Sequence, residues 1–405
     1  MPTAPSATVF DEPGHSRAAH AASAASPALT GEIVRGAAAF AALAAEWERL
    51  AARAANGVFQ TPSFLSIWAR HFTADKPERF WCVTVRMRGE LCLVWPIEIC
   101  RCGPIPVRIA SNAGAPISQY DEILIAPKGD PLALFAAALE TLRAAGVDLL
   151  TVERVRADSA LAAALPAFAR RLGEPDAAPF TVTDPEGLKA FLASRKSKLR
   201  KESNRRRNAL AAIGELELVM PEDPATTRLW LEETLELKRD WLKDKGMVSR
   251  AFLDRRTHDC LESFAGELGG SGGAVRLLAP RLTVGGRFAA QEIAFLHNGA
   301  YHLFLRAFSP EFAAHGPGNV LTEMVLAWCA EEGILRYDML PPRFRNKREW
   351  QSGEVEVADY AMPLTATGRL YQGIVVDTLK PAIRNLYYAL PQGMRSFLAG
   401  RTLRL

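Results

Sequence analysis

The alternation of apolar and polar residues along the chain predicts two α/β units. In the first unit, β-rich runs at 80–86 and 91–97 flank the turn Arg88-Gly89-Glu90 and predict a hairpin. In the second, runs at 288–296 and 301–308 flank His297-Asn298-Gly299, and Asn-Gly is a strong hairpin signal. Each unit has helices, then a hairpin, then a helix and a strand. This shared order favours an internal duplication, although no residue-level repeat is visible.

Helical periodicity, capping residues and short β-rich runs predict the other elements. Together they predict an α/β fold with a mixed sheet. In the first unit we expect helices at 37–55, from Thr61-Pro62 onward and at 132–145, and strands at 32–36, 107–110, 122–126 and 148–155. In the second unit we expect helices at 224–245 and 319–332, and strands at 215–220, 275–278, 334–340 and 355–363.

The length of 405 residues favours more than one domain. The first thirty residues are rich in Ala, Pro and Ser, without the basic start and apolar core of a secretion signal, and predict a flexible tail. The expected order is a tail at 1–30, a first domain at 31–182, a basic helical connector at 183–214, a second domain at 215–365 and a basic helical tail at 366–405.

The composition is 49% hydrophobic and 23% charged, close to globular averages, which excludes a disordered or coiled-coil protein. No apolar stretch approaches the roughly 18–20 residues of a membrane span. The six cysteines form no CxxC pair, so we expect buried reduced thiols, no metal and a cytoplasmic location. Lys and Arg exceed Asp and Glu by 49 to 45, and this net charge of +4 argues against a DNA partner.

The positive charge is concentrated between Arg195 and Arg207, where eight of thirteen residues are cations. A solvated helix face is the usual interpretation of such a run. Three functional interpretations compete with it: binding of CoA or nucleotide-sugar phosphates, contact with anionic lipid, and contact with RNA. We favour binding of phosphate or of an acidic glycan precursor, with Arg205 and Arg206 as candidate substrate-binding residues, and the membrane surface next. RNA comes last, because no aromatic residue in the run offers a platform for base stacking.

A glycine-containing loop, His315-Gly-Pro-Gly-Asn319, leads directly into the helix predicted at 319–332. A helix start leaves backbone N–H groups unpaired and carries partial positive charge, so the loop suits a pyrophosphate. A plain Gly/Pro loop before a helix remains the alternative. The spacing is neither that of a Walker loop nor that of a dinucleotide fingerprint.

The hairpin, the glycine loop, the helix and a strand ending in Tyr337-Asp338 together resemble the acyl-CoA-binding half of GNAT acetyltransferases. The chain is more specifically similar to the CelD/BcsL-type acetyltransferases associated with cellulose and exopolysaccharide biosynthesis. The resemblance covers about residues 30–360. It is carried by Phe59-Gln60-Thr61-Pro62-Ser63-Phe64 with Trp68, Gly89 to Pro96, Lys198-Leu-Arg-Lys to Arg207, Leu210 with Gly214, Lys238-Arg-Asp-Trp241, Phe308-Ser309-Pro310, Gly316-Pro317-Gly318, Tyr337-Asp338, and Lys347 with Trp350.

The resemblance implies two GNAT-like domains in tandem, arranged as in the Fem-type peptidyl transferases. Residues 215–365 would hold acetyl-CoA as co-substrate, and the acceptor would attack the thioester directly. The backbone at Gly316, Gly318, Asn319 and Val320 would hold the pyrophosphate. The sequence departs from the family at Asn346, where an aromatic residue is usual, and at Leu340-Pro341-Pro342, where a glycine turn is usual.

An amine or hydroxyl acceptor needs a base to take its proton. The candidate catalytic residues are Asp338, His302, Glu292 and Tyr337. A structural role is the alternative for Asp338, by pairing with Arg343 or Arg345, and for His302, as a buried sheet residue. Only one of Gln291 and Glu292 can face the site, since strand residues alternate. Gln291 and Lys347 are candidate substrate-binding residues, with a solvated lysine as the alternative for Lys347.

The leading hypothesis is a bacterial acyl-CoA-dependent acyltransferase that modifies a carbohydrate or amino-sugar intermediate in exopolysaccharide or cellulose biosynthesis. Its acceptor would be a small molecule or a glycan precursor. Contact with the inner membrane or with a polysaccharide synthase complex would fit this role. Two alternatives stay open: a Fem-type transferase that uses aminoacyl-tRNA, and a catalytically silent GNAT-fold subunit of a polysaccharide synthase.

Overall fold

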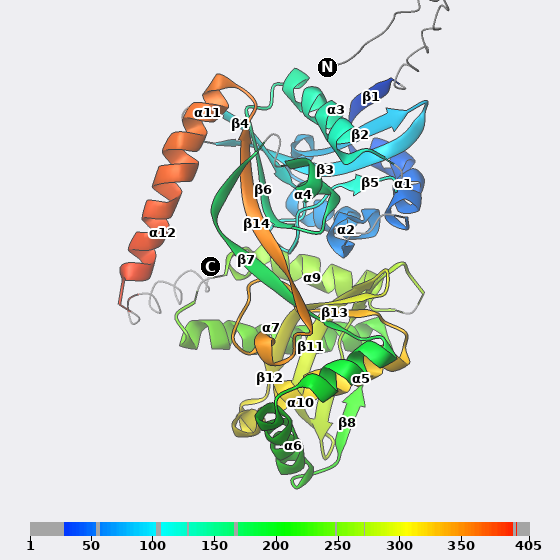
Figure 1. Cartoon of the computed structure of the whole chain (residues 1–405), viewed down its shortest axis with the longest axis vertical. Helices are drawn as coiled ribbons and strands as arrows, with labels where there is room; N and C mark the ends of the chain where they lie inside the picture. Colours follow the sequence, from blue (N-terminus) through cyan, green and yellow to red (C-terminus); the bar gives the residue numbers. More distant parts are fainter. Residues whose placement is uncertain are drawn as a thin grey trace, which may run out of the picture.

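One continuous mixed sheet runs through both halves of the molecule and carries helices on its faces (Figure 1). The computed structural model describes residues 28–53, 57–102, 107–127, 129–165, 169–247, 249–270, 272–391 and 394. Its fourteen described strands follow the order β1-β2-β3-β4-β6-β14-β7-β13-β12-β11-β10-β8, with β5 beside β3 and β9 beside β11. This architecture confirms the predicted mixed α/β fold.

The first half contains every element predicted for it. Residues 1–27 of the tail predicted at 1–30 lie outside the described residues, and the first strand already begins at Leu29, inside the range assigned to the tail. Thr61 caps its helix by accepting a hydrogen bond from the Phe64 amide, as expected. The elements are β1 (Leu29–Arg35), α1 (Ala37–Ala51), α2 (Pro62–Phe72), β2 (Phe80–Met87), β3 (Glu90–Cys102), β4 (Val107–Asn112), β5 (Leu124–Ile125), α3 (Pro131–Ala144), β6 (Leu149–Arg156) and α4 (Ala160–Ala164).

The second half departs from prediction in its connector, which is two helices rather than one. Arg195 and Lys196 have extended backbone, with ψ of 136° and 138°, and this separates α5 from α6. Strand β10 and helices α8 and α9 were not predicted. The elements are α5 (Pro185–Ser194), α6 (Ser197–Ala211), β8 (Leu216–Val219), α7 (Pro224–Asp244), α8 (Arg250–Leu253), α9 (Arg255–Leu268), β9 (Val275–Leu278), β10 (Arg281–Val284), β11 (Arg287–His297), β12 (Ala300–Phe308), the 3-10 turn η4 (Pro310–His315), α10 (Pro317–Glu331) and β13 (Arg336–Asp338).

Two long strands connect the halves, β7 (Arg170–Val182) and β14 (Gly353–Pro363). Strand β14 comes late in the sequence, yet it pairs with β6 of the first half as well as with β7. Strand β7 in turn pairs with β13 of the second half. The halves therefore share one sheet. The chain then continues through α11 (Ala366–Tyr371), the π-helical η6 (Gln372–Leu379) and α12 (Lys380–Ala389).

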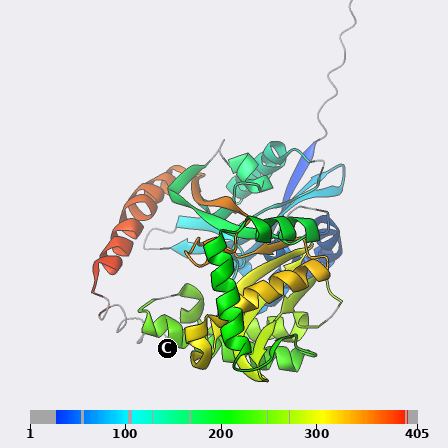
Figure 2. The ribbon, with the colours of Figure 1, turned by 60° about the horizontal axis from the view of Figure 1, so that its bottom comes forward.

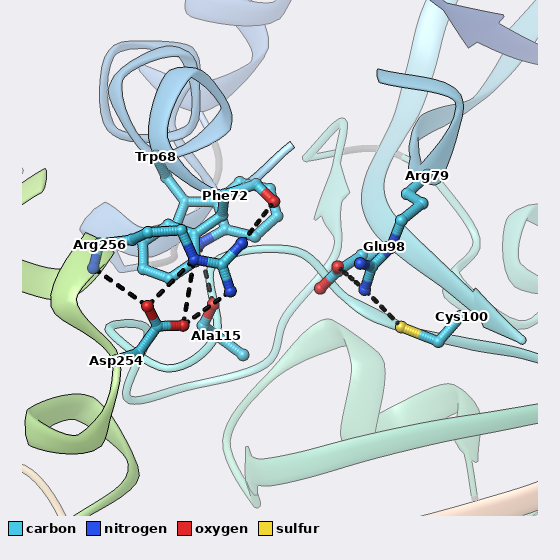
Figure 3. Close-up of polar contacts among 8 residues, drawn as sticks. All are labelled: Trp68, Phe72, Arg79, Glu98, Cys100, Ala115, Asp254 and Arg256. Carbon is cyan, nitrogen blue, oxygen red and sulfur yellow. Dashed lines mark hydrogen bonds and ion pairs between the residues drawn. The ribbon is translucent and has the colours of Figure 1, made fainter. Parts of the chain in front are cut away.

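Packing of α2 against α9 adds a second connection between the halves (Figure 3). The guanidinium of Arg256, at the start of α9, pairs with Asp254 at 2.7 Å and donates to the carbonyl of Phe72 at 3.4 Å. It also lies 4.9 Å from the centre of the Phe72 ring, which stacks on Trp68. Nearby, Phe64 stacks on Phe264 with ring centres 4.6 Å apart. The two halves thus form one packed body.

Candidate active site

Strands β12 and β13 separate after a short parallel ladder. They pair only at Ala300–Arg336, Tyr301–Tyr337 and His302–Asp338. Beyond Asp338 the chain stays beside β7, where the Met339 amide donates to the carbonyl of Pro179. On β12 the register against β11 shifts at Phe304, and such bulges are common next to active sites. We call the opening beyond His302 and Asp338 the β12/β13 split.

Helix α10 begins beside this split with no side-chain cap. Gly316 has φ 63° and ψ 51°, a left-handed conformation that glycine adopts without strain. Pro317 occupies the first turn, where its missing N–H is no loss. The amides of Gly316 and Asn319 already donate to the carbonyls of Ala313 at 3.2 Å and Gly316 at 3.1 Å, so the helix start offers an anion its partial positive charge and the amide of Gly318. This geometry supports the anion-binding interpretation of Gly316, Gly318 and Asn319, while the side chain of Val320 packs in the core beneath them.

The basic helix α6 lies against the start of α10 (Figure 2). A Cβ atom on Gly316 would lie 3.4 Å from Nε of Arg206, so this guanidinium borders the loop. Arg206 pairs with Glu202 at 3.0 Å and with Glu349 at 3.5 Å. Arg205 points elsewhere: it is exposed and pairs with Glu202 on its own helix. The two candidate arginines therefore occupy different environments.

A groove of about 920 Å³ lies next to this loop, between α5, α6 and residues 345–352. Its lining includes the cations Arg195, Lys196 and Arg348. The guanidinium of Arg195 lies 4.1 Å above the ring of Trp350, whose Nε1 donates to Oδ1 of Asn319. The groove is thus physically coupled to the α10 start. Its cations and aromatic walls suit the phosphates and base of a nucleotide.

A second cavity, of about 600 Å³, lies on the opposite face of the sheet among α7, α8, α9 and β12. It reaches the β12/β13 split, because residues just beyond the parallel ladder, Phe304 on β12 and Pro342 after β13, line it. We call this space the acceptor cavity. Sequence reasoning missed it because α9, with apolar residues packed on α2, was not predicted. Its polar and aromatic lining includes Lys238, Trp241, His258, Glu262, Phe304 and Phe344.

Lys238 is a partly buried cation in the lining of the acceptor cavity. Its Nζ lies 4.0 Å from the ring centre of Trp241. Burial lowers the pKa of Lys238 from its ordinary value, and the positive charge of Arg306 lowers it further. The motif Lys238-Arg-Asp-Trp241, part of the family resemblance, therefore brings a cation and an aromatic face to one wall of the cavity.

Glu292 and Tyr337 belong to a buried cluster under α10. The Glu292 carboxylate is fully buried and accepts hydrogen bonds from Tyr301 at 2.8 Å, Tyr337 at 2.8 Å and Arg306 at 2.6 Å. Burial, together with the negative charge of Glu292, raises the pKa of both tyrosines well above the ordinary value. This cluster orients Arg306, whose Cδ lies 3.3 Å from where a Gly318 Cβ would be. The geometry favours a supporting role for both residues.

Asp338 and His302 lie deeper, at the junction of the two halves. Asp338 is 1% exposed and accepts hydrogen bonds from the Tyr120 hydroxyl, Arg156 and the Leu340 amide, each at 2.8 Å. Its ion-pair partner is therefore Arg156 of the first half, rather than Arg343 or Arg345. The ring nitrogens of His302 have no hydrogen-bond partner in the described part of the chain, and Nδ1 lies 4.0 Å from Asp338. Burial lowers the pKa of His302 to about 4, partly offset by Asp338.

Gln291 and Lys347 have defined partners. The side chains of Gln291 and Glu292 point to opposite faces of β11, as alternation requires. Gln291 accepts a hydrogen bond from Arg281 at 2.9 Å, on the α7 face. The Nζ of Lys347 donates to the carbonyls of Leu340 at 2.8 Å and Pro342 at 2.9 Å, and burial lowers its pKa to about 8. Lys347 thus holds the turn that borders the acceptor cavity.

Among the described residues, one group has the geometry to hold a metal ion. It consists of Glu232, His258 and Glu262, whose ligand atoms lie within 4.8 Å of one another beside the acceptor cavity. Glu232 is exposed, and carboxylates of this kind commonly occur without an ion. The trio therefore offers proton-accepting groups at the cavity as readily as metal ligands.

Residues 197–348 match the acetyltransferase (GNAT) domain family. This span contains α6, the start of α10, the β12/β13 split and the lining of the acceptor cavity except Gln119. It confirms the prediction of a GNAT-type acyltransferase, and domains of this class use acyl-CoA. The finer resemblance to CelD/BcsL-type enzymes stays a prediction, as do the roles of individual site residues. A search of curated protein sequences finds no match.

Solved structures with a similar fold are distant in sequence. A crystal structure of FemX is 14% identical, covers 85% of this chain and 99% of its own, and has a TM-score of 0.56. A C-terminal domain assigned to a lysylphosphatidylglycerol synthetase from Agrobacterium fabrum is 13% identical, covers 84% and 96%, and has a TM-score of 0.50. A tandem GNAT protein from the clavulanic acid pathway is 14% identical, covers 83% and 99%, and has a TM-score of 0.47. The FemX likeness confirms the predicted tandem, Fem-like fold.

Proposed function

We propose that the protein transfers an acyl group from acyl-CoA to an amine or hydroxyl of a carbohydrate or amino-sugar intermediate. One observation carries this proposal: the uncapped start of α10 and the acceptor cavity meet the same β12/β13 split from opposite faces of the sheet. A donor held by its pyrophosphate at Gly316 and Gly318 would extend its thioester into the split. An acceptor in the cavity would then reach the thioester carbonyl without a covalent enzyme intermediate.

The chain supplies groups for each part of this transfer. Arg206 and the α10 amides would bind the donor phosphates. The partly buried cation of Lys238 would stabilise negative charge as it develops on the thioester oxygen, where a low-dielectric site strengthens the interaction. His258 or Glu262 would accept the acceptor's proton at the cavity wall, and a base role for Asp338 remains a second possibility. Holding donor and acceptor together contributes further rate acceleration by proximity.

A carbohydrate suits the acceptor cavity in size and lining. A volume of about 600 Å³ falls within the range of small-ligand sites. Trp241, Phe304 and Phe344 offer apolar faces to the C–H surfaces of a sugar ring, and Lys238 and Glu262 offer charge to its polar substituents. The role in exopolysaccharide or cellulose biosynthesis rests on the CelD/BcsL resemblance. The reaction would take place in a bacterial cytoplasm or at the inner face of its membrane.

Calorimetry with acetyl-CoA tests the donor site. We expect micromolar binding that falls at least about 100-fold in Gly318→Asp, because a carboxylate would then occupy the anion site. Gly270→Asp is the matched control, since Gly270 has open space around it and lies away from α10. Absence of acetyl-CoA binding by the wild type, or equal binding by Gly318→Asp, would contradict the donor site.

Release of free CoA thiol tests the acceptor. Wild-type protein with acetyl-CoA should release CoA when nucleotide-linked amino sugars are added, and Lys238→Met should lower kcat at least about tenfold. Leu229→Met, an exposed position on the same helix, is the control. If acetyl-CoA binds but no carbohydrate triggers release, the carbohydrate part of the proposal fails while the donor part stands.

Transfer from aminoacyl-tRNA is the second candidate, supported by the cations of α6 beside the α10 start. A charged tRNA that binds to the wild type, together with no response to acetyl-CoA, would favour this candidate. Binding of neither donor would favour the silent subunit of a polysaccharide synthase.

A further inference from the structure

The last helical segment extends away from the packed body (Figure 1). Elements α11, η6 and α12 follow one another without a break from Ala366 to Ala389. Only the first half of this segment is docked, through Gly368, Gln372 and Val376, which are buried. From Thr378 to Ala389, no described side chain is buried. A short helix without tertiary contacts is marginal in water, so this half-docked helix is poorly stabilised by its own chain.

Large apolar side chains run along the outward face of this segment. They are Leu370, Ile374, Leu379, Ile383 and Leu386, each between 49% and 67% exposed. Their spacings of four, five, four and three residues follow helical turns, with the spacing of five falling inside the wider π-helical η6. The other exposed large apolar residues of the described body are scattered singly, which is normal for a soluble surface. We call these five residues the apolar stripe.

The same part of the sequence is strongly basic. Residues 366–405 contain six cations and one acid, a net charge of +5, whereas the whole chain carries only +4. The single acid, Asp377, pairs with Arg170 of the body at 3.2 Å, so its charge is already balanced by a cation outside this part of the sequence. The cations are Arg369, Lys380, Arg384, Arg395, Arg401 and Arg404.

We propose that the apolar stripe docks this helix onto a membrane surface that contains anionic lipid. An amphipathic helix with an apolar face and basic flanks lies in the interface plane, with its apolar side chains among the acyl chains and its cations at the headgroups. A second copy of the chain is the less favourable occupant, because it would bring two tails of +5 together. None of the described helices has the length and apolar content needed to cross a membrane.

Flotation of the full-length protein with vesicles tests the proposal. We expect wild-type protein to float with phosphatidylglycerol/phosphatidylcholine vesicles and to stay in solution with phosphatidylcholine alone. Salt at 0.5 M should weaken the binding by screening. Ile374→Asp with Ile383→Asp should lower the apparent affinity at least about tenfold, because both charges would enter the apolar layer. The variant pair Leu229→Asp with Leu335→Asp is the matched control, since both are exposed leucines on the body.

The proposal is supported if the control pair still binds the anionic vesicles and if the circular dichroism of both double variants equals that of the wild type. Wild-type protein that ignores anionic vesicles, or that binds neutral vesicles equally well, overturns it. A wild-type dimer in light scattering that the Ile374/Ile383 variant converts to a monomer, without vesicle binding, also overturns it and assigns the stripe to a second copy.

Discussion

Each half of the molecule contains two parallel strands with a helix between them in sequence, but the spaces beyond the two strand pairs differ. In the first half, β4 and β6 run parallel through Ile109–Leu149, Ala110–Leu150 and Ser111–Thr151, with α3 between them in sequence. In the second half, β12 and β13 run parallel through three residue pairs, with α10 between them. By register, Ser111 and Thr151 correspond to His302 and Asp338. The halves are therefore comparable position by position.

The two central helices start differently. Asp130 caps α3 by accepting a hydrogen bond from the Leu132 amide at 3.0 Å, so a built-in carboxylate already satisfies this helix start. Helix α10 starts at Gly316 without any side-chain cap and with Arg206 beside it. An incoming anion would meet a negative charge at the start of α3, and at the start of α10 a helix end without a capping side chain.

The spaces beyond the parallel pairs also differ. In the first half, the segment from Ala113 to Ile123 packs against β6, where the Glu153 amide donates to Asp121 at 2.7 Å. Most residues of that segment are buried. In the second half, the corresponding space opens into the acceptor cavity. The first half thus fills this space with its own chain, whereas the second half leaves a cavity there.

Removal of the ion pair that joins the halves should have the largest effect. Asp338→Leu leaves Arg156 without its buried partner and should lower the free energy of unfolding by roughly 3–5 kcal/mol, measured by urea denaturation. Asp158→Leu is the control, because Asp158 is a half-exposed partner of the same arginine and its loss should cost at most about 1 kcal/mol. Equal effects of the two variants would show that the junction is not held by Asp338.

A separate variant, Asp338→Asn, tests the catalytic role of the same residue. A fall in kcat of less than about tenfold in this variant would rule Asp338 out as the general base.

The second-largest effect should come from His302, which should make the free energy of unfolding depend on pH. Ser111, the corresponding residue of the first half, cannot produce such a dependence. The folded pKa of about 4 lies below the ordinary 6.5, so the unfolded chain takes up the proton first as the pH falls. As the pH falls below about 6.5, the free energy of unfolding should therefore decrease by ~1.36 kcal/mol per pH unit. The total loss near pH 4 should be about 3 kcal/mol. Subtracting the unfolding free energy of His302→Leu from that of the wild type at each pH isolates this contribution. A difference that stays constant between pH 7 and pH 4 would contradict it.

Most of the plan of each half could be predicted from the sequence. The Asn-Gly turn, the Thr61 cap and the glycine start of α10 are local signals, and each appears in the structure where the residues placed it. The position of β14 could not be predicted, because its partners on β6 lie about two hundred residues earlier. Helix α9 was missed although its apolar face packs on α2, since no capping motif beyond Asp254 announced it.

The candidate site was predictable where it depends on backbone. Gly316 and Gly318 were named because glycine before a helix has a specific conformational meaning, and their role in binding the donor stays a prediction. Glu292 and Asp338 were named as bases because they stand on the right strands. Their partners, Arg306 and Arg156, come from other strands, and nothing local in the sequence reveals them. The acceptor cavity depends on packing between helices, and sequence periodicity alone does not define such a space.

The environment of Arg206 allows a test of the phosphate interpretation of the basic helix against the solvated-face interpretation. Arg206→Gln should weaken acetyl-CoA binding about tenfold, or ~1.4 kcal/mol, because one charge-assisted contact to a phosphate is lost. Arg205→Gln is the matched control on the neighbouring residue, which is exposed and faces Glu202. Titration calorimetry measures both. Equal affinities of the two variants for acetyl-CoA would favour the solvated-face interpretation for this part of α6.

The smallest expected effect concerns the cap that distinguishes α3 from α10. Asp130→Ala removes the carboxylate and should lower the free energy of unfolding by about 1 kcal/mol, the usual contribution of a helix cap. Asp223→Ala at the start of α7 removes a cap of the same kind in the other half and should also lower the free energy of unfolding. Neither variant should change the stoichiometry of one acetyl-CoA per chain, because the segment from Ala113 to Ile123 still fills the space that a second donor would need. A second acetyl-CoA bound to Asp130→Ala would mean that the cap alone prevents donor binding at α3, and that the first half retains a usable donor site.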